Sequence, residues 1–523
     1  MKTNIILPLL FFSVLTLACV GKEAGPGSTI LNARFAGIKE TIVEKIDKGE
    51  IPSMSVAVAE NGKIIWMESF GWSDKENRIK ATPETLYSIA SLSKTLTATG
   101  IMKLSEKGLV DLDQDIQTYF GEPELKYYVE SDKKVSCRHL LTHTSGLQMH
   151  FNYFYDDEKE TVPPVKQVVE RYGFIVTQPS SKFSYANLGY GILGEVISET
   201  TGRDFNEFMT EEIFLPLGMT QTTLDISSQT KKKLAKRYDF SGSLLPFSFS
   251  DTPGAGNASS TVKDLIHFGM FHLGQQSGNQ GSVLSRTTIE SMQRGQYPDN
   301  SNNRNNCGLG WWVEDNSYKY KMIFHAGGMD GVESMLRLLP QKDIAVVAIV
   351  NQSTANADLT DHFTEIILNE LVPDLKEKDQ SNNASETPTV KGIQQKDLLG
   401  RWNGFIDTHD EKIPLSLVIQ EDGDIHVYDN EVPFMIDIFI GSQGTGFQHG
   451  ILLNKLFFYD GRFMGWYTDS IPSEDTKRCS HITMLDLKYD SGKIKGTAAA
   501  LANSNRMYFG ISHYVELERV ENE

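Results

Sequence analysis

A serine and a lysine three residues apart, Ser91 and Lys94, stand just before an apolar stretch of the sequence. A serine hydroxyl is a weak nucleophile at neutral pH and needs a base within hydrogen-bonding reach. Residues i and i+3 of a helix share a face, so the Lys94 amine can reach the hydroxyl if a helix begins at Ser91. A helix N-terminus also favours a developing alkoxide at that oxygen. The pair predicts a nucleophile with its proton acceptor.

The same Ser-x-x-Lys spacing occurs at three other places, so context has to separate them. Ser131–Lys134 and Ser228–Lys231 lie in charged stretches, and Ser260–Lys263 lacks an apolar lead-in such as the "LYSIA" that ends at Ala90. A lysine acts as a base only when burial or a nearby positive charge lowers its pKa well below about 10.4. Of the four matches, Ser91 is the one placed for chemistry.

Two further short motifs offer groups that can share the proton or hold a substrate. Residues Tyr185–Asn187 supply a phenol that could relay a proton and an amide that could hydrogen-bond a substrate carbonyl. Residues His325–Gly327, followed by Gly328, lie at the end of a strand-like run. Each motif is weak alone, because Tyr428–Asn430 and His272–Gly274 repeat the patterns.

Strand-like sequence at both ends of the first 375 residues must position these motifs. Two runs within residues 53–71 flank Asn61–Gly62, the strongest short-range hairpin signal. Residues 93–107 predict a helix, residues 308–352 predict three strands, and residues 358–371 predict a closing helix. We therefore expect an α+β fold, in which one antiparallel sheet is assembled from both ends of the domain, is flanked by helices and surrounds a helical insertion.

The remaining third of the chain has a different character. Residues 376–396 are polar, lack periodicity and contain a proline, which is typical of a linker. Short strand-like pieces punctuated by Gly and Asp follow, and this spacing predicts a small antiparallel barrel or sandwich. The expected organisation is a domain over residues 28–375, this linker, and a small all-β barrel domain over residues 397–523.

The N-terminal residues predict export rather than a folded element. Lys2 precedes an apolar run from Ile5 to Ala18 that is too short to cross a bilayer and has the form of a signal-peptide core. The ending "LTLAC" resembles a bacterial lipoprotein signal, which implies lipidation of Cys19; an ordinary secretory signal cut near Ala18 is the alternative. We expect residues 1–19 to be a signal and the protein to lie in the periplasm or cell envelope, anchored to a membrane.

Charge narrows the range of partners. The chain of 523 residues has a formal net charge of −18 and no long basic cluster, which argues against a nucleic-acid surface. The 40% hydrophobic composition is ordinary for a globular chain with more than one core. The expected partner is a small-molecule or peptide substrate, and the oligomeric state stays open.

Taken in order, the three motifs resemble the signature of class C β-lactamases and penicillin-binding proteins, Ser-x-x-Lys, Tyr-x-Asn and His/Lys-x-Gly. Longer stretches resemble the same superfamily, among them "CRHLLTHTSGL", "YGILGEVISETTGRDFNEFMTEEIFLPLGMTQT", "PGAGNASSTVKDLIHFG" and "GLGWW". The resemblance covers residues 30–372. A catalytic domain followed by a small β-barrel is similar to CubicO-group peptidases, some of which carry a lipocalin-like C-terminal domain.

The resemblance implies a role for each motif residue. Ser91 is the acyl-accepting nucleophile, Lys94 and Tyr185 together form the base system, and Asn187 orients the substrate. The backbone N–H groups of Ser91 and Gly328 form the oxyanion hole, where loss of one donor typically costs about 10²–10³ in rate. The resemblance implies no metal and no organic cofactor.

The third motif departs from the pattern of many members, which have Lys-Thr-Gly there to hold a substrate carboxylate. His325 is expected to be mostly neutral at pH 7, and Ala326 supplies no hydroxyl. The predicted function is therefore a serine hydrolase that cleaves a small ester, amide or peptide through an acyl-enzyme on Ser91, with His325 contacting substrate. A true class C β-lactamase or D-Ala-D-Ala carboxypeptidase, and a non-catalytic binding homologue, are the alternatives.

Other candidate features keep more than one interpretation. His139 and His143 are four residues apart without the acidic residue of a zincin helix, so they are expected to be structural. Tyr153, Phe154 and Tyr155 could shape substrate specificity, but core packing or a clasp explains them as well. The C-terminal domain could bind a ligand, cap the cleft or mediate oligomers.

Overall fold

The structure is a computed structural model that describes residues 33–275, 283–296, 306–315, 318–353, 359–376, 398–421, 434–440, 451–452, 456–459, 462–467, 471, 473–504 and 506–520. The predicted signal with Cys19, and all of the predicted linker except residue 376, lie outside these residues. None of the helices in the described part of the chain is both long enough and apolar enough to span a bilayer.

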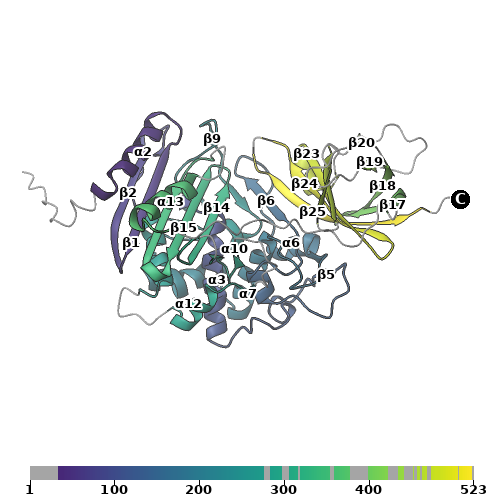
Figure 1. Cartoon of the computed structure of the whole chain (residues 1–523), viewed down its shortest axis with the longest axis horizontal. Coiled ribbons are helices and arrows are strands. Elements are labelled where there is room, and N and C mark those ends of the chain that lie inside the picture. The colour runs from purple at the N-terminus through teal and green to yellow at the C-terminus, as the bar shows by residue number, and fades with distance from the viewer. Residues whose placement is uncertain are drawn as a thin grey trace, which may run out of the picture.

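The first sheet has eight strands in the order β12-β13-β14-β15-β16-β1-β2-β3, and its pairings are antiparallel (Figure 1). Its strands are β1 (Ser53–Glu60), β2 (Lys63–Asp74), β3 (Ile79–Lys80), β12 (Asn306–Cys307), β13 (Trp312–Glu314), β14 (Met322–Met329), β15 (Val332–Leu339) and β16 (Ile344–Val350). Asn61 and Gly62 join β1 to β2 with positive φ values of 50° and 75°, which a two-residue hairpin turn requires. Strand β16 pairs with β1, Val350 opposite Met54. The sheet is thus assembled from both ends of the domain, as predicted.

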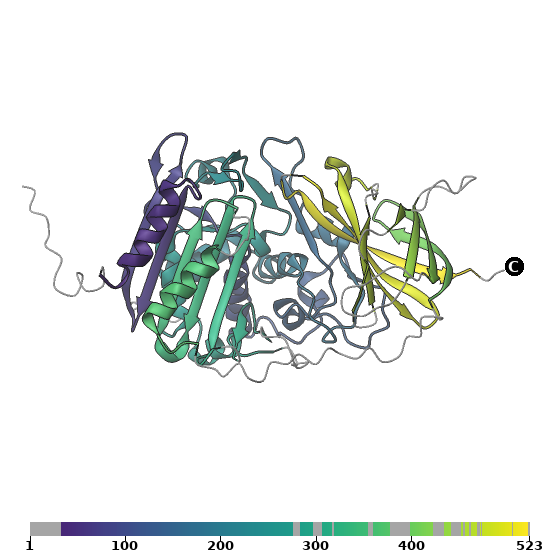
Figure 2. The same ribbon diagram turned by 45° about the horizontal axis from the view of Figure 1, so that its top comes forward.

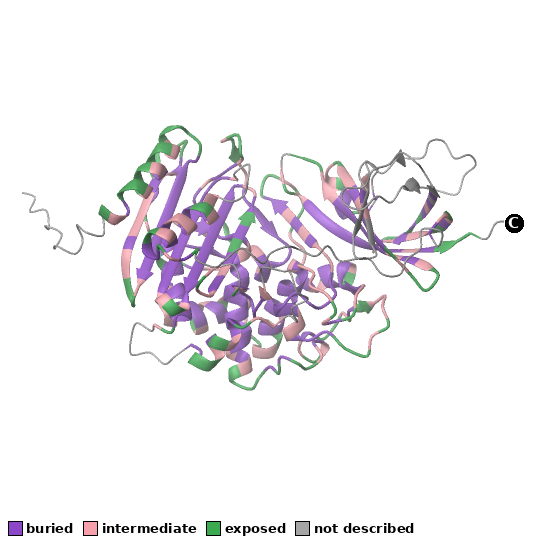
Figure 3. Ribbon diagram, viewed as in Figure 1, coloured by how far each residue is buried: buried purple, intermediate pink, exposed green. Residues whose placement is uncertain are grey.

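Helices cover both faces of this sheet. Helices α2 (Ala36–Asp47) and α13 (Leu359–Leu371) pack on one face, and α11 (Val262–His272) packs on the other (Figures 1 and 2). Successive residues of β16 point to opposite faces of the sheet, so Val346 belongs to one core and Val347 to the other. Because both faces are covered, β16 is apolar at every position, and Figure 3 shows the central strands as buried.

The predicted helical insertion lies between β3 and β12. Its longest helices are α3 (Ser93–Glu106) and α7 (Asn187–Thr201), which pack against each other. The other helical segments are η1 (Ala90–Leu92), α4 (Gln117–Phe120), α5 (Cys137–Leu141), α6 (Val165–Tyr172), α8 (Phe205–Met209), η2 (Thr210–Phe214), η3 (Leu215–Leu217), α9 (Ser228–Lys231), α10 (Pro253–Gly256) and α12 (Arg286–Met292); η4 (Pro340–Lys342) joins β15 to β16. Short strands connect them: β4 (Tyr87–Ser88), β5 (Lys126–Tyr127), β6 (His150–Tyr155), β7 (Phe174–Ile175), β8 (Arg237–Tyr238), β9 (Leu244–Leu245), β10 (Ser248–Ser250) and β11 (Ser259–Ser260).

The C-terminal residues form a second antiparallel sheet in the order β20-β19-β18-β17-β25-β24-β23-β22-β21. Its strands are β17 (Gly400–Asp407), β18 (Lys412–Glu421), β19 (Phe434–Ile440), β20 (Ile451–Leu452), β21 (Leu456–Tyr459), β22 (Arg462–Tyr467), β23 (His481–Asp490), β24 (Lys493–Ala502) and β25 (Phe509–Arg519), and η7 (Asp475–Arg478) precedes β23. This confirms an all-β second part. The pairings within the described ranges leave β20 and β21 as open ends, so they do not close the predicted barrel.

The two parts of the chain share backbone hydrogen bonds through β6. Strand β6 pairs with β10 on one side and with the start of β25 on the other. In Figure 1, β6 lies between the first sheet and the C-terminal strands. A strand edge presents unpaired N–H and C=O groups, and here β25 covers that edge. Strand β25 of the C-terminal part therefore pairs side by side with a strand of the insertion.

Candidate active site

Ser91 lies in the 3₁₀ turn η1, immediately ahead of α3. The predicted contact requires a helix that begins at Ser91, but the α-helix begins at Ser93, two residues later. The turn still brings Ser91 and Lys94 together, because side chains at i and i+3 eclipse one another in a 3₁₀ turn. Ala90, directly before the serine, has a φ of 47°, a left-handed conformation that costs energy in a non-glycine residue and clusters at functional sites.

The Lys94 amine is placed as a base for this serine. Its Nζ lies 3.2 Å from Ser91 Oγ, and it donates hydrogen bonds to Asn187 Oδ1 at 2.7 Å and to the Ala255 carbonyl at 2.8 Å. The side chain is fully buried, and burial holds the pKa of Lys94 well below its usual range. A neutral amine has two N–H bonds and one lone pair. With both hydrogens donated to Asn187 and Ala255, the lone pair is left for the Ser91 hydroxyl.

Tyr185 reaches the same serine from the start of α7. Its phenol lies close enough to the Ser91 side chain for that side chain to lower the pKa of the phenol, and its ring lies under Lys94 Nζ at 4.9 Å from the ring centroid. Burial raises the pKa of Tyr185, and the contact with Ser91 offsets only part of that effect. The phenol therefore keeps its proton at neutral pH, which suits it to give a proton rather than to remove one.

Asn187 links the Lys94 amine to strand β6. Its Oδ1 accepts from Lys94 Nζ, and its Nδ2 donates to the His150 carbonyl at 2.8 Å. The side chain is half-buried, so part of it faces open space. Ser91, Lys94, Tyr185 and Asn187 are thus brought together, and their catalytic and substrate-binding roles stay predictions.

The third motif lies on β14, beside the serine turn. A Cβ at Gly327 would lie 2.1 Å from the Ile89 carbonyl oxygen, so only glycine allows this strand to approach η1 so closely. Ala326 and Gly328 are exposed, whereas the His325 side of the strand is buried and His325 is only 4% exposed. Gly328 is therefore available for its predicted role as an oxyanion-hole donor.

His325 is buried rather than open to a substrate. Burial is the main cause that lowers the pKa of His325 to about 3, so the ring is neutral at pH 7. Its Nδ1 lies 2.7 Å from the Ala326 carbonyl, which can only accept, so Nδ1 carries the proton. Substrate contact by this side chain stays a prediction; the geometry supports packing beside Lys94 more directly.

His143, which the sequence predicts to be structural, packs directly against the candidate site. Its Nδ1 accepts the Ala186 N–H at 3.1 Å, and its ring stacks on Tyr185 with centroids 4.3 Å apart. Burial is the main cause that holds the pKa of His143 well below its usual range, so the ring adds no positive charge beside the amine. The sequence could not show that His143 has a φ of 55°. The one sequence signal for its place beside the site was its position in the "CRHLLTHTSGL" stretch, which resembles the superfamily.

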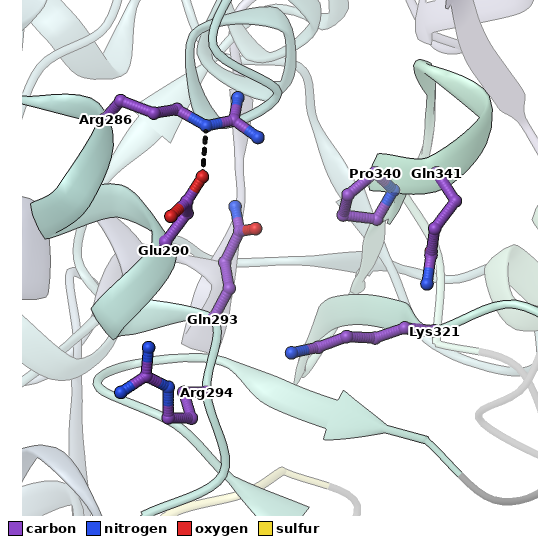
Figure 4. Close-up of a pocket in the computed structure, with 7 residues that line it drawn as sticks. All are labelled: Arg286, Glu290, Gln293, Arg294, Lys321, Pro340 and Gln341. Atoms are coloured by element: carbon purple, nitrogen blue, oxygen red, sulfur yellow. Dashed lines mark hydrogen bonds and ion pairs between the residues drawn. The ribbon is translucent and has the colours of Figure 1, made fainter.

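Other candidate sites share no residue with this cluster. Figure 4 shows a pocket of about 370 Å³ lined by Arg286, Glu290, Gln293, Arg294, Lys321, Pro340 and Gln341. Lys321, which lines this pocket, lies seven residues before Gly328 along β14, so at about 3.3 Å per residue these two positions are roughly 23 Å apart. Within the described residues, one group could share a metal ion, namely His409, Asp410 and Glu474 in the C-terminal part.

Comparisons with known proteins agree with this geometry. The Beta-lactamase family matches residues 38–369. Protein flp of Staphylococcus aureus (strain MRSA252) is 26% identical over 339 residues, which are 63% of this chain and 66% of that protein. The chain thus spans just under two thirds of the length of this relative.

Two solved structures are similar along almost the whole chain. The octameric penicillin-binding protein homologue from Pyrococcus abyssi has 21% identity and a TM-score of 0.56, covering 92% of this chain and 99% of that chain. SurE with D-Leu has 18% identity and a TM-score of 0.59, covering 94% of this chain and 100% of that chain. At these identities the likeness concerns the fold. Because the family match covers more than half of its residues, the chain belongs to the Beta-lactamase family.

Proposed function

We propose that the chain is a serine hydrolase that cleaves a small ester, amide or peptide through an acyl-enzyme on Ser91. The observation that carries this proposal is the Lys94 amine, fully buried and 3.2 Å from Ser91 Oγ. Membership of the Beta-lactamase family supports the same chemistry. Exposed surface lysines are protonated at neutral pH, whereas burial favours the neutral amine that a base requires.

The proposed acylation begins when the Ser91 hydroxyl passes its proton to Lys94 Nζ as Oγ attacks the substrate carbonyl carbon. The charge that develops on the carbonyl oxygen is held by the N–H groups of Ser91 and Gly328. The C–O or C–N bond to the leaving group then breaks, and that group takes a proton through Tyr185 and Lys94. A water molecule resolves the ester on Ser91 in the second half of the reaction.

The substrate class follows from the third motif. A neutral His325 and an alanine at 326 supply neither the ammonium nor the hydroxyl that would hold a carboxylate. This supports neutral esters, amides or peptides over substrates that must present a carboxylate at this point. The complex of SurE with D-Leu supports including D-amino-acid derivatives among the substrates tested.

Steady-state hydrolysis tests this proposal. We expect the wild type to hydrolyse p-nitrophenyl esters, Ser91→Ala to lose that activity, and turnover of a chromogenic cephalosporin to be slow. Fast cephalosporin turnover with negligible esterase activity would support a true β-lactamase instead. Absence of any turnover, together with an unmodified Ser91, would support the non-catalytic homologue.

We also propose that the protein is exported and anchored through Cys19, because the sequence around this residue resembles a lipoprotein signal. Labelled fatty acid should then be incorporated into the wild type and not into Cys19→Ala. A product that is released in soluble form without label would support an ordinary secretory signal.

A further inference from the structure

Strand β6 has two different faces beside the candidate active site. Side chains alternate along a strand, so Phe151 and Tyr153 share one face, while Asn152 and Phe154 share the other. Phe151 and Tyr153 are half-buried, whereas Asn152 and Phe154 are buried. The Phe151 and Tyr153 rings lie 6.1 Å apart. The more open face of β6 therefore presents an aromatic pair.

Tyr153 borders the Ser91 turn. Its side chain packs against Ala90, the residue before the serine, and against Met329 and Val332 at the end of the β14–β15 hairpin. It is also close enough to Tyr185 to contribute to the raised pKa of that phenol. Tyr153 is half-buried and thus lies between the nucleophile turn and the strand of the third motif.

Both polar backbone groups of Tyr153 are bound by residues of the C-terminal part. Its N–H donates to the Tyr508 carbonyl at 2.7 Å, and its carbonyl accepts from both terminal nitrogens of Arg478, each at 3.1 Å. Arg478 also donates to Asn152 Oδ1, and its guanidinium lies over the Phe154 ring at 4.5 Å. The side chain of Arg478 is 8% exposed. Both terminal nitrogens of this buried guanidinium are paired, which fixes its geometry, while its Nε has no hydrogen-bond partner among the described residues.

The same C-terminal residues shape the surroundings of the aromatic pair. Gly510 of β25 lies opposite Phe151, and a Cβ at Gly510 would come within 2.3 Å of the Phe151 ring. Asp330, two residues after Gly328, accepts from the Tyr155 hydroxyl at 2.6 Å and from the Met507 N–H. The turn after the third motif and strand β6 are therefore tied to one C-terminal loop.

We propose that Phe151 and Tyr153 form an apolar subsite beside Ser91, and that the C-terminal sheet sets the position of that subsite. Tyr153 is the specificity-determining residue, and Arg478 is a positioning residue that acts through the Tyr153 backbone. The preferred substrate carries an apolar or aromatic group next to its scissile carbonyl. This inference rests on the proposed hydrolase function and assigns the C-terminal part a role in substrate selection.

Two esters that differ in the acyl group test the subsite. For Tyr153→Ala, kcat/KM for p-nitrophenyl phenylacetate should fall at least tenfold, mainly through KM, while kcat/KM for p-nitrophenyl acetate changes less than threefold. Arg478→Met should show the same selective loss, and Arg478→Lys should recover part of it, because an ammonium can still donate to the Tyr153 carbonyl. Gly510→Ala should also act selectively, because its methyl group displaces the Phe151 ring.

Arg506→Met is the matched control, since Arg506 also crosses to the first part of the chain, pairing with Asp157 at 3.0 and 2.9 Å. Its further contacts, with the Tyr508 hydroxyl at 3.5 Å and the Tyr155 ring at 5.1 Å, do not include the Tyr153 backbone. It should leave both esters unchanged. Equal losses for both esters in Tyr153→Ala, or the same effect in Arg506→Met as in Arg478→Met, would overturn the inference. If Arg478→Met does not fold, the Tyr153→Ala and Gly510→Ala results decide it. Labelling of Ser91 by a small fluorophosphonate in every variant shows that the hydrolase proposal stands independently.

Discussion

At the level of single residues, Lys94 and Tyr185 respond to burial in opposite directions. Burial disfavours the charged form of each group, so it lowers the pKa of the Lys94 amine and raises the pKa of the Tyr185 phenol. The amine is thereby available to accept a proton, and the phenol is available to give one. This difference supports Lys94 as the proton acceptor and Tyr185 as the proton donor. The sequence could assign the base system only to the two residues together.

The pH dependence of acylation follows from the Lys94 amine. Below the lowered pKa of Lys94 the amine is protonated and cannot accept the Ser91 proton, so the acylation rate should fall about tenfold per pH unit. Above that pKa the rate should level off. Lys94→Ala should lower the rate by about 10²–10⁴ and remove this limb of the profile. Rates of fluorophosphonate labelling across pH measure both effects, and a limb that persists in Lys94→Ala would assign it to another group.

Tyr185→Phe separates the phenol from the amine. The ring and its contact with Lys94 remain, but the hydroxyl that passes a proton to the leaving group is lost. We expect hydrolysis of an alkyl ester, whose alkoxide leaving group needs a proton, to fall by about 10²–10⁴, with the pH limb of the Lys94 amine still present. Loss of that limb in Tyr185→Phe would instead make the phenol the base. Circular dichroism of each variant controls for folding.

At the level of elements, strand β14 packs closely against the serine turn. Gly327 packs against Ile89 and Leu92, and the Ser334 hydroxyl of β15 donates to the Ile89 carbonyl at 2.8 Å. Strands β14 and β15 thus both hold the turn in place. Such contacts can stabilise the left-handed φ of Ala90, which is otherwise unfavourable.

Gly327→Ala should therefore destabilise the protein. Its Cβ would meet the Ile89 carbonyl oxygen at 2.1 Å, so β14 or the turn must move, at a cost of about 1–3 kcal/mol. The neighbouring Gly328→Ala is a matched control for stability, because a Cβ there meets no atom within 4 Å. Thermal unfolding should show a lower Tm for Gly327→Ala only; equal Tm values for both variants would contradict the packing argument.

Local signals predicted much of this fold, and long-range contacts set the rest. Asn61–Gly62 fixed the first hairpin, and the predicted helix over residues 93–107 became α3, which spans Ser93–Glu106. The sequence could not show that the Ala255 carbonyl would take a hydrogen from the Lys94 amine, because 161 residues separate them. Nor could it show that β25 would pair with β6, since an exposed strand edge accepts many partners.

At the level of the whole molecule, the two parts of the chain share one apolar core, to which Phe509 and Val515 of the C-terminal part belong, and they are also joined by polar contacts. The Tyr172 hydroxyl donates to Asp475, Arg171 pairs with the same carboxylate at 3.0 Å, and the Tyr128 and Tyr514 rings stack at 3.8 Å. Strand pairing between β6 and β25 runs through the same boundary. These contacts give the C-terminal sheet a fixed place beside β6.

Asp475→Ala tests this boundary. It leaves the buried Tyr172 hydroxyl without its acceptor and Arg171 without its closest partner, so we expect a loss of about 1–3 kcal/mol in unfolding free energy. The exposed pair of Arg506 with Asp157 should contribute less than about 1 kcal/mol, which makes Arg506→Met the comparison. Urea unfolding midpoints measure both; equal shifts would show that burial does not distinguish the two pairs.

The central claim is that Ser91 is the nucleophile, and intact-mass analysis after exposure to a fluorophosphonate tests it most directly. The wild type should gain the mass of one adduct, and Ser91→Ala should gain none. Adduct formation that is unchanged in Ser91→Ala would contradict the claim and move the search for the reactive group elsewhere in the chain.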